Sequence, residues 1–148
     1  MIFQRESQFR EYVTKVAEDM GFHKSHIESP VTSAGVPDLN LFKGVDVWLE
    51  LKVWTLAKGV KMRPTQKLWH LNRHRSGGLS WVLLTFDDKL SLVPGETAAR
   101  LGAKDPAWTF GYMEGSTSEL PRILRYLHRQ GLRQLETNRI LTLRNSAY

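Results

Sequence analysis

Hydrophobic residues at helical spacing open the chain. Between Glu6 and Met20 they recur every three or four positions, as on one face of an α-helix, and Gly21 supplies a stop. These residues are Phe9, Tyr12, Val13, Val16, Ala17 and Met20. The next stretch, 23–36, is rich in Ser, Thr, Pro and Gly without periodicity, which predicts a surface loop that includes His23 and His26.

Two stretches of alternating residues then predict a β-hairpin. Residues 38–42 alternate polar with apolar side chains, Lys43-Gly44 makes a turn, and 45–54 is a longer run of β-branched and aromatic residues, with Asp46 exposed near the turn. Side chains alternate between the two faces of a strand, so Glu50 and Lys52 lie side by side. Trp48 and Trp54 share their face, and the opposite face holds Val47, Leu49, Leu51 and Val53.

The remainder of the chain mixes helices and strands. Pro64 suits the first turn of a helix that runs to about Arg75, and residues 79–86 and 90–93 predict two strands. The partly buried face of that helix is expected to consist of Leu68, Trp69 and Leu71. We further expect a short helix at 96–101, a strand at 108–113 and, capped by residues 116–118, a last helix at about 119–130. The apolar stripe of this last helix is Leu120, Ile123, Leu124 and Leu127.

Length and composition indicate one domain. A chain of 148 residues, 41% of them hydrophobic, can bury a core without disulfides or metals. We expect residues 1–95 to be its core and 96–148 an extension of the same domain. The absence of cysteine excludes disulfides and thiolate zinc sites, and no small-molecule cofactor is indicated. The sequence shows neither a signal peptide nor an apolar run near the roughly 20 residues of a membrane span, which predicts a cytoplasmic protein without a membrane segment.

The charge distribution favours a polyanionic partner. The net charge of +6 does not by itself choose between nucleic acid, a membrane surface and simple solubility, but residues 55–86 contain no Asp or Glu. The basic residues of this stretch that we expect to contact DNA are Lys58, Lys61, Arg63, Lys67, Arg73 and Arg75. A solvated helix face is the alternative interpretation. His70 and His74 lie four positions apart but lack a third metal ligand, so we expect both on the helix surface.

Three residues of the hairpin carry candidate chemistry. Phosphodiester hydrolysis uses a divalent cation held by oxygen ligands, together with a cationic group for the developing negative charge. Asp38 begins the first strand, and Glu50 and Lys52 share one face of the second, so the hairpin brings these groups together. The alternatives are that Asp38 is a turn residue and that Glu50 and Lys52 form an exposed ion pair, which would stabilise little.

The same residues carry a family resemblance. Gly35-Val36-Pro37-Asp38-Leu39, followed by Trp48-Leu49-Glu50-Leu51-Lys52, resembles the signature of PD-(D/E)xK nucleases, and the VRR-type nuclease domain most closely. The similarity runs from the first helix to about Phe86. It implies an α/β fold with a restriction-endonuclease-like core, in which helices flank a mixed central β-sheet.

The resemblance also implies roles for individual residues. Asp38 and Glu50 would bind the metal with the backbone carbonyl of Leu51, and Lys52 would serve the water and the scissile phosphate. Gln66 matches the family glutamine that supports the lysine or a phosphate, although a lone helix glutamine is usually a surface residue. Glu6 is the candidate third carboxylate, because it borders the apolar face of the first helix whereas Glu11 points away from it.

The function expected from this resemblance is DNA hydrolysis. Mg²⁺ would be the cofactor, with Mn²⁺ as a substitute, and the enzyme would act as a homodimeric, structure-specific endonuclease on branched DNA such as Holliday junctions. One alternative is a restriction-type enzyme or an exonuclease acting on duplex DNA. A second is a DNA-binding protein that uses the same fold without catalysis.

Overall fold

The computed structural model describes residues 1–27 and 35–146, so residues 28–34 of the predicted loop lie outside the described residues. Helices and strands alternate along the chain. In order they are α1 (Glu6–Asp19), β1 (His23–His26), β2 (Leu39–Phe42), β3 (Asp46–Val53), α2 (Pro64–Arg75), β4 (Trp81–Phe86), β5 (Lys89–Pro94), α3 (Gly95–Ala98), η1 (Pro106–Trp108), β6 (Met113–Ser116), η2 (Thr117–Glu119) and α4 (Leu120–Ser146).

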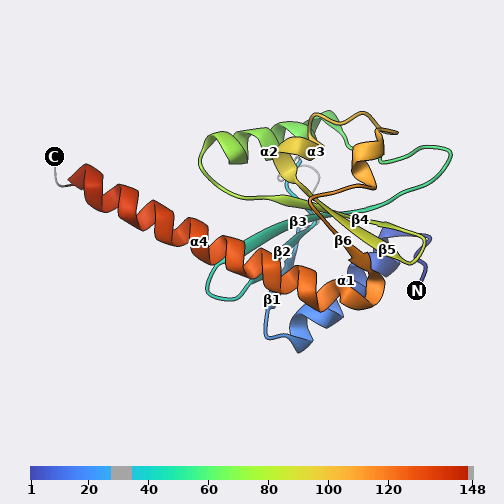
Figure 1. Ribbon diagram of the computed structural model, residues 1–148, viewed down its shortest axis with the longest axis horizontal. Helices are drawn as coiled ribbons and strands as arrows, with labels where there is room; N and C mark the ends of the chain where they lie inside the picture. The colour runs from blue at the N-terminus through green and yellow to red at the C-terminus, as the bar shows by residue number, and fades with distance from the viewer. Residues whose placement is uncertain (28–34, 147–148) are drawn as a thin grey trace.

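One open sheet organises the described part of the chain. Its six strands lie side by side in sequence order, and every neighbouring pair is antiparallel except β3 and β4. A parallel pair needs a crossover connection, and α2 provides it here. The predicted hairpin is confirmed as β2 and β3, and the protein has the expected mixed α/β architecture with helices flanking the sheet (Figure 1).

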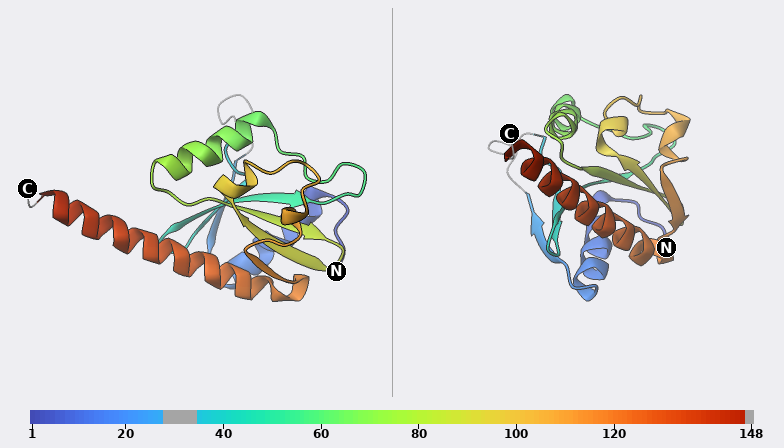
Figure 2. Two further views of the ribbon diagram at one scale, coloured as in Figure 1. Left: turned by 45° about the horizontal axis from the view of Figure 1, so that its top comes forward. Right: turned by 60° about the vertical axis from the view of Figure 1, so that its left-hand side comes forward.

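The helices form a layer on each face of the sheet. Helices α1 and α4 cover one face, while α2 and α3 cover the other, as the views in Figure 2 also show. Phe9 of α1 and Leu127 of α4 pack with Leu49 of β3 in the larger core. The smaller core joins Val82 and Leu84 of β4 to Trp108 of η1. The active-site candidates of β3 face this second layer, beneath α2.

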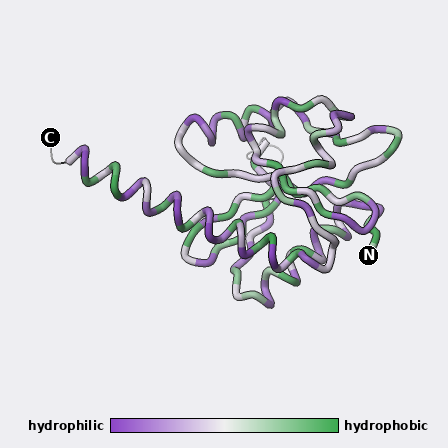
Figure 3. The backbone as a smooth tube through the Cα atoms, viewed as in Figure 1, coloured by the Kyte–Doolittle hydropathy of each residue, from purple (hydrophilic) through white to green (hydrophobic). Residues whose placement is uncertain are grey.

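Helix α4 is much longer than the sequence pattern predicted. Its first half packs on the sheet through the predicted stripe, which is buried, but the helix continues to Ser146 and projects beyond the sheet (Figure 1). The predicted end near residue 130 was wrong because only Gly131 interrupts a run of residues compatible with a helix. Apolar and polar residues alternate on the projecting half (Figure 3), whose apolar side chains are exposed.

Two predictions of local structure were wrong. His23–His26 is not a loop but an edge strand that pairs with β2. The pairing uses backbone hydrogen bonds, so it forms although the side chains of this segment are polar. The strand predicted at 108–113 is replaced by η1 and an irregular segment, and β6 begins only at Met113. Asp105 explains the helical turn, because its carboxylate accepts from the Ala107 N–H at 2.9 Å.

The remaining elements form where they were predicted, but their bounds differ by a few residues. The short helix expected at 96–101 is α3, which covers Gly95–Ala98. Ser116 opens the turn η2 ahead of α4, where its N–H donates to Glu119 Oε1 at 3.0 Å. No helix within the described ranges combines the length and apolarity required to cross a membrane.

Candidate active site

Two charged side chains of β3 are buried beneath α2. Leu49 and Leu51 point into the core formed with α1 and α4, so strand alternation directs Glu50 and Lys52 to the opposite face. Glu50 is only 1% exposed and Lys52 only 6%. Burying a charge is costly unless it is paired and hydrogen-bonded, so the partners of these two groups define the site.

Gln66 is the shared partner of both groups. Its Nε2 donates to Glu50 Oε1 at 2.7 Å, and its Oε1 accepts from Lys52 Nζ at 3.3 Å and from the Arg63 N–H at 2.9 Å. Lys52 Nζ also lies 3.5 Å from Glu50 Oε1. These bonds fix the orientation of the amide, because only its NH₂ can donate to the carboxylate. Gln66 is buried, so its role is not that of a surface residue.

Asp38 lies directly beside Glu50. Leu39 pairs with Leu49, so Asp38 neighbours Glu50 across the hairpin, and its N–H donates to Glu50 Oε2 at 3.3 Å. The preceding Gly35 has a φ of +80°, and a Cβ there would lie 2.0 Å from the Thr65 carbonyl oxygen. A glycine is therefore required for the segment before Asp38 to rest on the first turn of α2.

The surroundings of Glu50 raise its proton affinity. Burial and the nearby Asp38 charge raise the pKa of Glu50 to about 8, and the opposing attraction of Lys52 is too weak to reverse this. When Glu50 is ionised as well as Asp38, the single ammonium group of Lys52 leaves the cluster short of positive charge. A cation bound between the carboxylates would favour the ionised form of Glu50.

Glu6 lies within electrostatic range of this cluster. Glu6 is exposed to solvent, yet desolvation by the surrounding protein raises its pKa; the Lys52 charge lowers this pKa and the Asp38 charge raises it. Glu11 is exposed too, so exposure does not distinguish the two glutamates. Across residues 1–27 and 35–146, however, no three His, Asp or Glu side chains are grouped closely enough to hold a metal ion. Asp38 and Glu50 thus form the carboxylate pair, and a ligand role for Glu6 stays a prediction.

His70 is a buried neighbour that the sequence reasoning placed wrongly on the surface. It is fully buried, and its Nδ1 lies 2.7 Å from Ser80 Oγ, whereas Nε2 has no partner within the described part of the protein. Burial and the charge of Lys52 lower its pKa to about 4, so it is neutral at physiological pH. Its position one turn after Gln66 was the available signal, because residues i and i+4 share a helix face.

Polar residues thus form the buried face of α2. Gln66 and His70 point to the sheet, whereas Leu68, expected on the buried face, is 54% exposed. Trp69 and Leu71 are half-buried, as predicted. The apolar spacing was misleading because the sheet beneath α2 presents charged residues that require polar partners.

The predicted DNA-contacting residues lie on and before α2. Lys58, Lys61, Arg63 and Arg75 are exposed, whereas Lys67 and Arg73 are half-buried. None of the six has a carboxylate within 4.0 Å among the residues described, so their charges are not neutralised by ion pairs there. The site thus adjoins a positively charged surface. His74 is exposed as predicted and lies 2.8 Å from Glu96.

Comparison with protein-family models gives no match, and no curated protein has a significantly similar sequence. Oxygen ligands, a buried ammonium group and a fixed amide converge at one position. Such a set can bind a hard cation and stabilise negative charge on a substrate.

Proposed function

We propose that this protein is a metal-dependent DNA nuclease with a restriction-endonuclease-like core. The observation that carries the proposal is the buried arrangement of Glu50 and Lys52 around Gln66, with Asp38 in contact with Glu50. The resemblance of the Gly35–Leu39 and Trp48–Lys52 segments to the PD-(D/E)xK signature, which involves the same residues, supports the same conclusion. The mixed sheet flanked by helices is compatible with that core.

The donor set fits a hard divalent cation. Asp38 and Glu50 supply carboxylates, the chain has no thiolate, and Mg²⁺ prefers oxygen ligands. These two residues would hold Mg²⁺ with the backbone carbonyl of Leu51, Glu6 is the predicted additional carboxylate, and Mn²⁺ would substitute. The cation would offset the charge of the phosphodiester transition state and acidify the attacking water.

The protein groups have distinct tasks in this proposal. Lys52 directs an ammonium group at the scissile phosphate, where it stabilises the developing negative charge and orients the water. Gln66 holds Lys52 and Glu50 at a fixed separation, since its amide contacts both. Preorganisation of this kind contributes to catalysis because the groups need not reorient during the reaction.

The expected substrate is branched DNA. The exposed basic residues before and on α2 suit contacts to the phosphate backbone, which position the protein without reading base sequence. The resemblance to VRR-type nucleases, rather than the basic surface itself, leads us to propose structure-specific cleavage of junctions by a homodimer. Restriction-type or exonucleolytic cleavage of duplex DNA is the alternative with the same chemistry.

The decisive experiment compares substrates and matched variants. The protein is incubated with Mg²⁺ or Mn²⁺ on a four-way junction, a linear duplex and a plasmid. Symmetric nicking confined to the junction supports the proposal, whereas cleavage of the duplex or plasmid favours the alternative. Asp38→Asn should reduce cleavage by about 100-fold or more, since it removes a metal-ligand charge.

Asp46→Asn is the matched control for this variant. Asp46 lies on the same strand and face as Glu50 but is exposed, and its carboxylate accepts from Asn40 Nδ2 at 3.1 Å. We expect Asp46→Asn to cleave like the wild type. Equal activity of both variants would refute the site assignment. A wild-type protein that binds DNA but stays inert with both cations on every substrate would instead be a non-catalytic DNA-binding protein.

A further inference from the structure

Two tryptophan rings adjoin the candidate active site. Trp48 precedes Glu50 by two residues on the same face of β3, and Trp69 follows Gln66 by three residues on α2. Their ring centroids lie 5.6 Å apart with an interplanar angle of 56°. Both side chains are half-buried, whereas Trp81 and Trp108 belong to the buried cores. The pair therefore presents partly accessible aromatic surface beside the catalytic groups.

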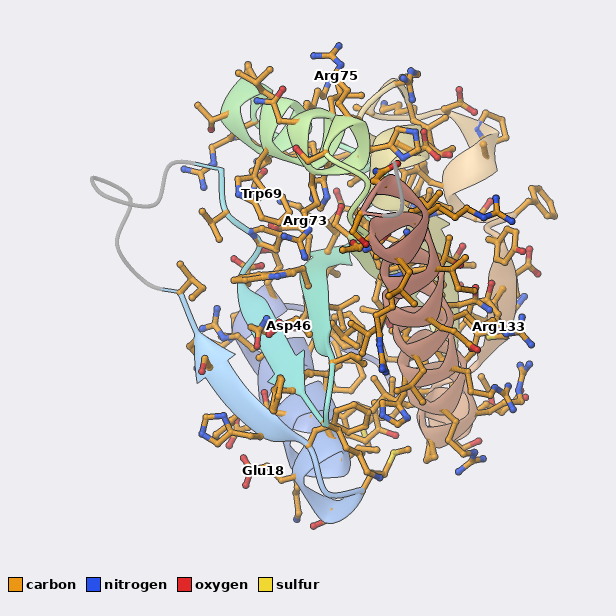
Figure 4. All side chains as sticks on the ribbon, turned by 90° about the vertical axis from the view of Figure 1, so that its left-hand side faces the viewer. Glu18, Asp46, Trp69, Arg73, Arg75 and Arg133 are labelled. Atoms are coloured by element: carbon orange, nitrogen blue, oxygen red, sulfur yellow. The ribbon has the colours of Figure 1, made fainter. Side chains whose placement is uncertain are left out.

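Neighbouring side chains hold the Trp69 ring in place. The guanidinium of Arg73 lies 6.0 Å from the Trp69 ring centroid, and Arg73 Nε donates to the Leu79 carbonyl at 3.3 Å. The His70 and Trp69 rings are nearly perpendicular, at 86°, with their centroids 5.5 Å apart. Figure 4 shows Trp69 and Arg73 directed from α2 toward the strands, while Arg75 points outward. A ring fixed in this way loses little conformational freedom when it binds a ligand.

The position of the pair relative to the carboxylates suggests what it binds. Successive residues on one face of a strand lie about 7 Å apart, so Trp48 is one such step from Glu50. A nucleotide whose phosphate lies at Glu50 and Lys52 therefore has its base within reach of the indoles. Arg73 adds positive charge at the same place, which favours the electron-rich face of a base and its phosphate.

We propose that Trp48 and Trp69 form a stacking platform for an unpaired nucleobase of the cleaved DNA strand. This inference rests on the proposed nuclease function and adds a basis for substrate selection to it. Bases inside a continuous duplex are already stacked on both faces, so the platform favours DNA in which the nucleotide next to the scissile phosphate can leave its base pair and stack, as at the branch point of a junction. Stacking on aromatic side chains tolerates any base, so no sequence preference results.

Binding measured in EDTA tests the platform without cleavage. A short single-stranded oligodeoxynucleotide is compared with an abasic oligonucleotide of equal length, which keeps the phosphates and lacks the bases. We expect the wild type to bind the base-containing strand about tenfold more tightly, as one stacked base provides. Trp69→Leu should lose this preference and keep its affinity for the abasic strand, while Trp69→Phe retains most of the preference.

Leu68→Ala is the matched control on the same helix, because Leu68 is 54% exposed and outside the platform. It should behave like the wild type. A second measurement needs no variant: 2-aminopurine placed next to the scissile phosphate should lose fluorescence when the wild-type protein binds, because stacking quenches it. Undiminished fluorescence, or equal affinity of the wild type for the two strands, overturns the platform.

The outcomes for platform and nuclease are separable. A protein that prefers bases in EDTA but cleaves nothing with Mg²⁺ or Mn²⁺ retains the platform and refutes the proposed function. A protein that cleaves DNA while Trp69→Leu keeps the full base preference retains the nuclease and refutes the platform.

Discussion

Replacing Glu50 by glutamine should stabilise the protein at neutral pH when divalent cations are absent. Glutamine has the shape of the protonated carboxylic acid and can still accept the hydrogen bond that Gln66 Nε2 donates to position 50. It removes the negative charge that burial and Asp38 disfavour. The variant thus tests whether placing the Glu50 carboxylate beside Asp38 is electrostatically unfavourable when no divalent cation is bound.

The magnitude follows from the raised pKa of Glu50. This pKa is about 8 in the folded protein against an ordinary value of 4.5, so at intermediate pH the folded state holds a proton that the unfolded state has released. Folding stability consequently decreases as pH rises through this window, by about 1.4 kcal/mol per pH unit. Between about pH 5 and pH 7 the wild type should lose about 3 kcal/mol from this group alone.

Urea unfolding in EDTA at several pH values measures the effect. The free energy of unfolding of Glu50→Gln minus that of the wild type should grow from about pH 5 to about pH 8 and level off above it. Glu11→Gln, which removes an exposed carboxylate, should track the wild type throughout. Parallel curves for Glu50→Gln and the wild type would show that Glu50 is ionised without cost and would refute the reasoning.

Adding Mg²⁺ extends the same experiment to metal binding. A cation held by Asp38 and Glu50 favours the ionised carboxylate, so Mg²⁺ should stabilise the wild type at pH 7 and above and do so less at low pH. Glu50→Gln should show a much smaller response. An equal response of both proteins would place the bound Mg²⁺ elsewhere.

Two further substitutions probe the packing beneath α2. Gly95→Ala should lower the free energy of unfolding by about 1–3 kcal/mol, because a Cβ there would lie 2.3 Å from both His70 Nδ1 and Ser80 Oγ. An unchanged thermal unfolding midpoint would contradict this close packing. Gln66→Leu should lower the free energy of unfolding by about 3 kcal/mol, because it leaves Glu50 and other buried groups without their partner, and it should also lower cleavage. Urea unfolding measures the first effect and a nicking assay the second, and near wild-type values in both would refute the bridging role of Gln66.

The parts of the fold that the sequence predicted correctly are those set by local patterns. Alternation over residues 45–54 is sufficient to place Glu50 and Lys52 on one face of a strand, and the turn at Gly44 brings Asp38 back toward them. Helical spacing likewise placed Phe9 and Val13 in the core. Period and turn chemistry are properties of neighbouring residues, so they can be recognised without the folded structure.

The features that were missed depend on contacts distant in sequence. His23–His26 is a strand only because β2 offers it an edge, and its exposed polar side chains carry no strand pattern. His70 is buried because the sheet brings Ser80 and Gly95 against it. The pairing of Trp48 with Trp69 requires β3 and α2 to stack, which neither segment specifies alone.

The buried site itself argues against a purely structural role for its charges. An exposed ion pair between Glu50 and Lys52 was the simple alternative, but both side chains are almost completely buried. Lys52 does not compensate for burial and for Asp38, since the pKa of Glu50 remains raised to about 8. Apolar residues at such positions are often as stabilising as a buried pair, or more so. Local arrangements that oppose stability are characteristic of functional sites, and one in which a single ammonium group faces two carboxyl groups is suited to an added cation.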